Sequence, residues 1–266
     1  MGGGERADSF GARPLSGKRV LITRPAQQAG ELAARLREAG AEPVVAPTIE
    51  IAAPADLDAA RAAVARARAY DWIVFTSRNA VEAFFERLAE LRDSGLSDDA
   101  SALGGAHVAA IGPKTAEALA SRAIRVDLIP TEFVNEAVAE ALLARTSPAE
   151  RVLLYRAQDA RDVLPDSLRE HGRVVDVVTA YQTRFVDDPA LTGKAERCDI
   201  VTFTSSSAVT GFLRNVPDAA HALSSKTVAA IGPITAQTAR DAGIRVDVVA
   251  EEFTTEGLVR ALATSR

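Results

Sequence analysis

The sequence is poor in the residues that most often bind metals or form cross-links. It has one cysteine, Cys198, and three histidines that stand far apart, His107, His171 and His221. A single cysteine excludes an intrachain disulfide and a thiolate metal cluster, and the histidine spacing fits no common ligand motif. We therefore expect no metal and no cofactor, and the cysteine content suits a reducing compartment such as the cytoplasm.

Sequence signatures of several common enzyme classes are also missing. The chain contains no GxGxxG after its first predicted strand, no GxxxxGK[ST], no GxSxG and no HExxH. These motifs respectively mark dinucleotide sites, P-loops, serine nucleophiles and zinc proteases. The sequence therefore gives no support to these chemistries.

Long apolar runs and an excess of positive charge are absent as well. No run approaches the ~18 apolar residues that a membrane span needs, and residues 1–17 lack the apolar core of a signal peptide. We expect residues 1–17 to form a flexible tail. The 36 acidic residues exceed the 31 basic ones, giving a formal charge of −5. This balance disfavours nucleic acid as a partner, so an anionic ligand would have to be held by local groups.

What the chain does contain is a regular alternation of short β-branched runs and helical stretches rich in Ala, Leu and Arg. The alternation begins at Lys18 and continues to the end of the sequence. It is typical of α/β structure with parallel sheets. A length of 266 residues and a hydrophobic content of 47% predict two globular domains.

An internal duplication covers most of this region. RVL at 19–21 recurs at 151–153, DWIVFTSRNAV from Asp71 recurs as DIVTFTSSSAV from Asp199, and VAAIGPKTA from Val108 recurs as VAAIGPITA from Val228. Two such halves, each with about four or five strands, predict two doubly wound domains. Clefts between domains are common ligand sites, so we expect the site there.

Candidate binding residues follow the apolar runs, because ligands of parallel sheets lie beyond the carboxyl ends of the strands. A serine N-cap or a proline in the first turn leaves backbone N–H groups that can bind an anion. Such residues also simply start helices, and surface arginines are usually solvated, so only the whole set argues for function. The candidates are Arg24, Thr76, Ser77, Arg78, Gly112, Lys114, Thr115, Arg156, Ser205, Ser206, Ser207, Gly232 and Thr235.

Tyr181 stands where the repeat breaks, because the first half has Ile49 at the matching position. A phenol can donate a proton to a leaving hydroxyl and then hydrogen-bond to it. Tyr181 is therefore the candidate general acid if it faces the ligand. The alternative is a strand tyrosine that packs at a domain edge.

Taken together, LITRP, DWIVFTSRNAVEAF, the twin VAAIGP motifs and TAYQT resemble the uroporphyrinogen-III synthase family, from about Lys18 to Ala263. The resemblance implies two flavodoxin-like domains with doubly wound parallel sheets, joined by a two-stranded β-ladder. Residues 18–47 and 184–266 would form domain 1, and residues 48–183 domain 2. VVAPTIEIA and VVTAYQTRF would be the crossing strands.

The same resemblance implies the reaction. The family substrate is hydroxymethylbilane, a linear tetrapyrrole with eight carboxylates. It is cyclised to uroporphyrinogen III with loss of water and inversion of ring D, through an azafulvene and a spiro-pyrrolenine. Tyr181 would assist departure of the hydroxyl, and Thr115, Ser206 and Thr235 would face the substrate. The family also implies a monomer without cofactor in tetrapyrrole synthesis, and a transient contact with hydroxymethylbilane synthase.

Two other functions fit parts of this pattern. Synthase-like domains also occur as non-catalytic ligand sensors in transcriptional regulators, and a fold alone does not secure an activity. A hinged binding protein could likewise close on a small polar molecule. Retention of Tyr181 favours the enzyme.

Overall fold

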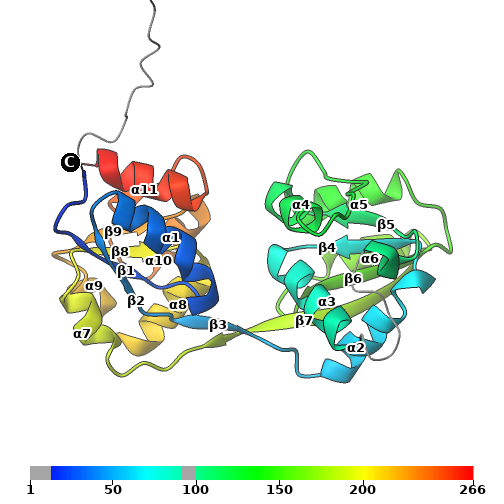
Figure 1. The fold of residues 1–266 in the computed structure, drawn as a ribbon, viewed down its shortest axis with the longest axis horizontal. Helices are drawn as coiled ribbons and strands as arrows, with labels where there is room; N and C mark the ends of the chain where they lie inside the picture. The colour runs from blue at the N-terminus through cyan, green and yellow to red at the C-terminus, as the bar shows by residue number, and fades with distance from the viewer. Residues whose placement is uncertain (1–12, 92–99, 266) are drawn as a thin grey trace, which may run out of the picture. The chain divides into compact units, whose positions relative to one another are not determined.

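The folded chain consists of two compact units, each built on a five-stranded sheet (Figure 1). The computed structural model describes residues 13–91 and 100–265. Unit 1 contains the chain up to Glu50 and the chain from Arg184 onward, and unit 2 contains Ile51–Thr183. The chain therefore passes from one unit to the other twice.

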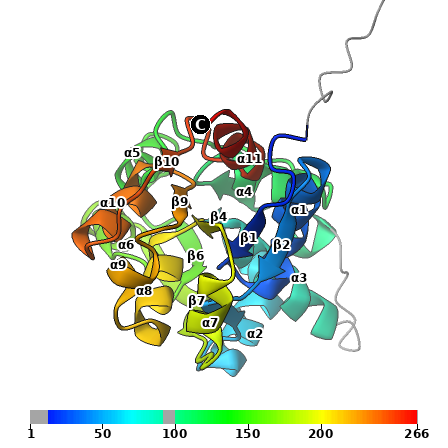
Figure 2. The ribbon, with the colours of Figure 1, turned by 90° about the vertical axis from the view of Figure 1, so that its left-hand side faces the viewer.

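The sheet of unit 1 is parallel and has helices on both faces. Its strands in spatial order are β2 (Glu42–Val45), β1 (Arg19–Ile22), β8 (Ile200–Phe203), β9 (Thr227–Ala230) and β10 (Val248–Val249). Its helices are α1 (Ala26–Glu38), α7 (Leu191–Glu196), α8 (Ser206–Asn215), α9 (Ala219–Ala222), α10 (Pro233–Asp241) and α11 (Thr255–Thr264). Val20 and Ile22 pack with α1 and α11, whereas Leu21, on the opposite face, packs with α8 and α10. Figure 2 shows these helices around the sheet of unit 1.

Unit 2 likewise has a five-stranded sheet with helices on both faces, and four of its strands pair in parallel. Its strands in spatial order are β3 (Ile49–Ala52), β7 (Val174–Phe185), β6 (Arg151–Ala157), β4 (Trp72–Phe75) and β5 (His107–Ala110). Its helices are α2 (Leu57–Ala65), α3 (Arg78–Glu90), α4 (Pro113–Ala120), α5 (Asn135–Leu143) and α6 (Val163–Glu170), with short 3-10 turns at Ala67–Ala69 and Ala100–Leu103. Ile73 and Phe75 pack with α2, α3 and α4, whereas Trp72 and Val74 pack with α5 and α6.

The strands that carry the repeated sequences take equivalent places in the two sheets. In unit 1 RVL lies in β1, the FTS motif begins at the end of β8, and VAA lies in β9. In unit 2 RVL lies in β6, the FTS motif begins at the end of β4, and VAA lies in β5. These strands are neighbours in the order β1-β8-β9 in unit 1 and β6-β4-β5 in unit 2. The fold is thus a mixed α/β fold with parallel sheets, and the turns after the repeated strands lie at one edge of each sheet.

The two chain crossings are anchored at one residue of unit 1, Thr48. Its Oγ1 donates to the carbonyl oxygen of Ala208 in α8 at 2.8 Å, and its own carbonyl accepts from the N–H of Val186 at 3.0 Å. A Cβ added to Gly211 would lie 2.3 Å from that carbonyl oxygen. Glycine at 211 is therefore needed for the outgoing and returning segments to pack closely against α8.

Residues 13–17, which precede the expected boundary at Lys18, are part of unit 1. Leu15 is buried in the α1/α11 core, and its N–H donates to the carbonyl of Ala39 at 3.0 Å. The expected tail is thus wrong for residues 13–17, because Leu15 caps the exposed end of this apolar cluster. Residues 1–12 of that tail lie outside the described residues.

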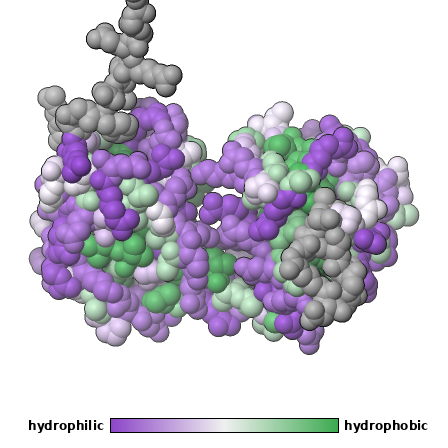
Figure 3. Space-filling model, in the orientation of Figure 1, coloured by the Kyte–Doolittle hydropathy of each residue, from purple (hydrophilic) through white to green (hydrophobic). Residues whose placement is uncertain are grey.

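On the face seen in Figure 3, hydrophilic residues cover most of each unit and apolar residues form smaller patches. No helix in the described part of the chain is both long enough and apolar enough to cross a membrane.

Candidate active site

Serine side chains start the helices that follow β4 and β8. Ser77 Oγ accepts from the N–H of Ala80 at 3.1 Å, and Ser205 Oγ accepts from the N–H of Ala208 at 3.1 Å. Both serines have extended backbones, with φ −164°, as N-cap residues do. The positive ends of α3 and α8 therefore lie at the carboxyl edges of their sheets.

Glycine and proline start the helices after β5 and β9. Gly112 and Gly232 are the N-cap residues of α4 and α10, and the following proline is the first helical residue. Neither glycine brings a capping side chain, and in α4 the N–H of Thr115 donates to the carbonyl of Gly112 at 3.1 Å. Thr115 and Thr235, in the first turn of each helix, are more than nine-tenths buried.

Tyr181 lies beside Ser77, with its hydroxyl oxygen 3.1 Å from Ser77 Oγ. The strand that bears Tyr181, β7, is separated from β4 by β6. The pairing of β6 with β7 shifts by one residue between Arg156 and Ala157, so that Ala157 faces Tyr181. A bulge of this kind redirects a side chain. The small Ala157 leaves room for the tyrosine, whose exposed fraction is 8%.

This arrangement allows the pair to supply the phenolic proton of Tyr181. Ser77 Oγ already accepts the Ala80 N–H, and either hydroxyl can donate in the bond to Tyr181. When Ser77 donates, the phenolic proton of Tyr181 is left for a third group. The start of α3 also favours the negative charge that develops on the phenol oxygen as that proton leaves. The geometry suits assistance to a leaving hydroxyl.

Arg156 is held by its own loop. Its Nη1 donates to the carbonyl of Arg161 at 2.6 Å and its Nη2 forms a short ion pair with Asp162, while the residue is 8% exposed. A buried guanidinium paired with a carboxylate has little charge left for a further anion. The sequence did not predict the partner Asp162.

The other candidate residues divide between the two units. In unit 2, Arg78 is exposed and forms an ion pair with Glu82 at 3.3 Å. In unit 1, Ser206 Oγ lies 2.7 Å from Thr238 Oγ1, which links the start of α8 to α10. Half-buried Arg24, Thr76 and Ser205, exposed Ser207 and exposed Lys114 also occupy the carboxyl edges of their sheets.

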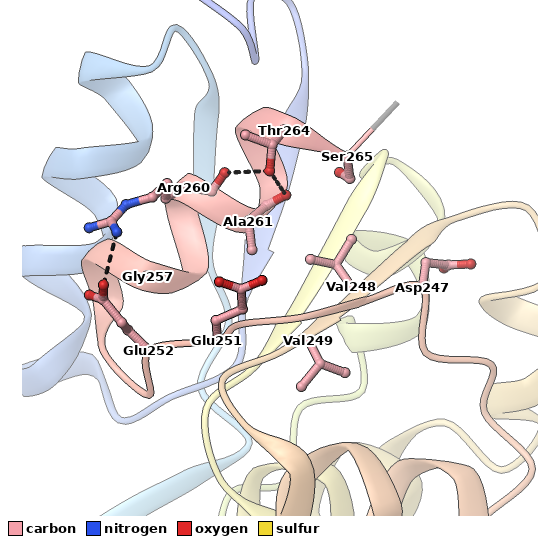
Figure 4. A pocket seen from close by; sticks show the side chains of 10 residues that line it. All are labelled: Asp247, Val248, Val249, Glu251, Glu252, Gly257, Arg260, Ala261, Thr264 and Ser265. Atoms are coloured by element: carbon pink, nitrogen blue, oxygen red, sulfur yellow. Dashed lines mark hydrogen bonds and ion pairs between the residues drawn. The ribbon is translucent and has the colours of Figure 1, made fainter. Parts of the chain in front are cut away.

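A pocket of about 500 Å³ in unit 1 is a poor match for a polyanionic ligand (Figure 4). Its lining includes Asp247, Glu251 and Glu252. The basic group there, Arg260, is paired with Glu252 at 2.9 Å. None of the candidate residues lines this pocket.

Three other titratable side chains, Cys198, Tyr155 and Tyr70, have raised pKa values. Burial raises the pKa of the Cys198 thiol, which disfavours the reactive thiolate. Burial raises the pKa of Tyr155 to about 12, and burial with the bond to Asp176 raises that of Tyr70 to about 12. No group of three or more His, Cys, Asp or Glu residues that could hold a metal occurs within residues 13–91 and 100–265.

The chain is similar to proteins of one family. A family model described as uroporphyrinogen-III synthase HemD matches residues 30–260. A uroporphyrinogen-III synthase from Synechococcus elongatus is 35% identical, with 94% of this chain and 96% of that protein covered. The porphyrin biosynthesis protein HemD of Ruminiclostridium josui is 32% identical; 97% of this chain matches 50% of that protein.

A solved structure shares the fold. It is a mutant uroporphyrinogen III synthase from Thermus thermophilus, with a TM-score of 0.62 and 20% sequence identity. The match covers 93% of this chain and 98% of that one.

Proposed function

Since the chain belongs to the uroporphyrinogen-III synthase family, we propose that it converts hydroxymethylbilane to uroporphyrinogen III and water, with Tyr181 assisting the departure of the terminal hydroxyl. The observation that carries this role is the 3.1 Å contact between Tyr181 and Ser77 at the start of α3. The phenol gives its proton to the leaving hydroxyl, which departs as water. The substituted carbon of ring D then attacks the methylene carbon of the resulting azafulvene to form the spiro-pyrrolenine. This intermediate fragments and recloses with ring D inverted, and the proton released on rearomatisation returns to the phenolate.

Holding the substrate in one shape contributes more than proton transfer alone. Orientation of reacting groups can lower a barrier by about 7–11 kcal/mol at best. The eight carboxylates of the substrate offer many points of attachment. We assign them to the helix starts after the FTS and IGP motifs, together with Arg24, Arg78 and Lys114, because N–H groups and cations lie there.

The role of Arg156 differs from that of the other basic candidates. Its contacts with Arg161 and Asp162 fix the segment that directly follows the bulge at Ala157. We assign Arg156 to positioning this segment, and through it Tyr181, rather than to binding a substrate carboxylate.

The finer architecture is also a proposal. The repeated strand order of the two sheets supports two flavodoxin-like domains joined by a β-ladder, with residues 18–47 and 184–266 in domain 1 and 48–183 in domain 2. The first of these boundaries falls three residues before the division at Glu50. From the family resemblance alone we add a cytoplasmic monomer that contacts hydroxymethylbilane synthase transiently.

The proposed reaction is tested by product analysis. Purified protein is incubated with freshly generated hydroxymethylbilane, the products are oxidised, and porphyrin isomers I and III are separated. We expect isomer III to dominate, whereas the control without protein gives isomer I. Isomer I alone from folded protein would refute catalysis and favour a ligand-sensing domain.

A further inference from the structure

Two phenylalanines are exposed at equivalent places in the two units. Phe133 is 58% exposed and Phe253 is 57% exposed, which makes them the most exposed phenylalanines among the described residues. Both belong to the repeated sequence, in the pairs Glu132-Phe133 and Glu252-Phe253. Phenylalanine is more often buried in a core, so this repeated exposure needs a reason.

Each ring lies against the glycine that starts a helix. A Cβ added to Gly112 would lie 3.2 Å from Cγ of Phe133, and a Cβ added to Gly232 would lie 3.1 Å from Cδ1 of Phe253. Each glycine is the second residue after its strand, β5 or β9, with one isoleucine between them. Both rings are therefore at the carboxyl edges of their sheets, where the candidate binding residues lie.

The candidate binding residues identified from sequence suit the carboxylates of the proposed substrate better than its pyrrole rings. Serine and threonine side chains can bind carboxylates but offer little surface to a pyrrole ring, and arginine and lysine can bind carboxylates or lie over a ring face but offer no apolar ring of their own. An aromatic side chain offers such a surface, through stacked or edge-to-face contact. Ile234, two residues after Gly232 in the first turn of α10, is a further exposed apolar side chain of unit 1, at 79% exposure.

From this geometry we infer that Phe133 and Phe253 are substrate-binding residues, each of which contacts a pyrrole ring of the linear tetrapyrrole while neighbouring groups hold its carboxylates. The inference rests on the proposed function. A purely structural role would be to cover Gly112 or Gly232, and leucine could fill that role equally well.

Leucine and tyrosine variants separate the two roles. We would measure the KM for hydroxymethylbilane from initial rates of isomer III formation, and the midpoint of thermal unfolding, for Phe133→Leu, Phe253→Leu and the corresponding tyrosine variants. Phe185→Leu is the control, because Phe185 is 38% exposed and its ring faces Arg214 at 4.6 Å. We expect each leucine variant to have a KM about three- to tenfold above that of the wild type and an unchanged unfolding midpoint. Each tyrosine variant, which keeps an aromatic ring, should have the wild-type KM.

Tryptophan at the same sites gives a second readout that does not depend on the leucine variants. Phe133→Trp and Phe253→Trp would each add one indole to the single Trp72 of the chain. We expect uroporphyrinogen III to quench the added fluorescence. The inference would be overturned if both leucine variants kept the wild-type KM, or if KM changed only together with the unfolding midpoint. It would also be overturned if uroporphyrinogen III did not quench the fluorescence of the added tryptophans. Failure of the wild-type protein to form isomer III would instead refute the proposed function.

Discussion

The hydroxyl of Tyr181 and the Oγ of Ser77 lie 3.1 Å apart, although the residues are 104 positions apart in the chain. Ser77 is placed by the start of α3, and Tyr181 by the shifted pairing of β6 with β7. The two therefore meet only when both elements are correctly formed. This contact ties the proposed proton donor to the start of the helix that follows β4, an interior strand of the sheet of unit 2.

Ser77→Ala should reduce both stability and turnover. The variant loses an N-cap, which costs about 1 kcal/mol, and it also loses the partner of Tyr181. We expect kcat to fall roughly tenfold because the phenol is less well oriented. Urea unfolding and isomer III kinetics measure the two effects.

Ser205→Ala is the matched comparison, since Ser205 caps α8 at the same 3.1 Å distance. Ser205→Ala should lower the free energy of unfolding by a similar amount. Its main kinetic effect should be a higher KM, because Ser205 is assigned to carboxylate binding. Ser77→Thr keeps a hydroxyl and should recover much of kcat. Equal kcat values for Ser77→Ala and wild type would refute the role of Ser77.

Arg156→Gln and Asp162→Asn should have similar effects. Each variant breaks the same ion pair. If Arg156 positions the loop after the bulge, both variants should therefore change KM or kcat unfavourably by the same several-fold factor. A direct role in carboxylate binding predicts the opposite for Asp162→Asn, which would release the guanidinium and lower KM. Steady-state kinetics of both variants and of the double variant distinguish the two roles.

Gly211→Ala should destabilise the protein by about 1–3 kcal/mol, because the new methyl group would meet the carbonyl oxygen of Thr48 at 2.3 Å. The control is Gly30→Ala in α1, where an added Cβ meets nothing within 4 Å. That substitution should stabilise the helix by up to about 1 kcal/mol. Urea unfolding of both variants provides the test, and equal shifts would contradict the steric argument.

Asp188→Asn should lower stability at neutral pH but not at low pH. A hydrogen bond from Lys194 at 2.7 Å, assisted by the N–H of Ala190, holds the pKa of Asp188 below its usual 3.8. A lowered folded-state pKa contributes stability above the unfolded-state value, and this is lost as pH falls through the folded-state pKa.

We therefore expect the free energy of unfolding of Asp188→Asn to be about 0.5–1 kcal/mol below that of the wild type. This difference should be constant between pH 7 and pH 5 and should shrink below about pH 4. Chemical unfolding over this pH range measures it. Asp187→Asn, at the exposed neighbouring position, is the control. A deficit that persists unchanged at the lowest pH would show that the ion pair is not its cause.

The sequence predicts the local features of the site well. Serine and Gly-Pro turns after apolar runs mark Ser77, Ser205, Gly112 and Gly232 as helix starts, because N-cap preferences are local. Repetition in the sequence indicates that one architecture is built twice. The α/β class follows from the alternation of strand-like and helical segments.

Contacts between distant segments could not be predicted in this way. The bond from Tyr181 to Ser77 depends on a register shift at Ala157 that no local pattern encodes. The pairing of Arg156 with Asp162 depends on the path of a loop. Burial of Leu15 depends on the end of α1, so composition alone wrongly assigned residues 13–17 to a flexible tail.

The most direct test of the account is the rate of isomer III formation by Tyr181→Phe. This variant keeps the ring, which packs in the core of unit 2, and removes only the hydroxyl. We expect folding to be retained and the rate to fall about 10²-fold, so that spontaneous isomer I dominates the product. A folded Tyr181→Phe variant that forms isomer III at the wild-type rate would contradict the central claim.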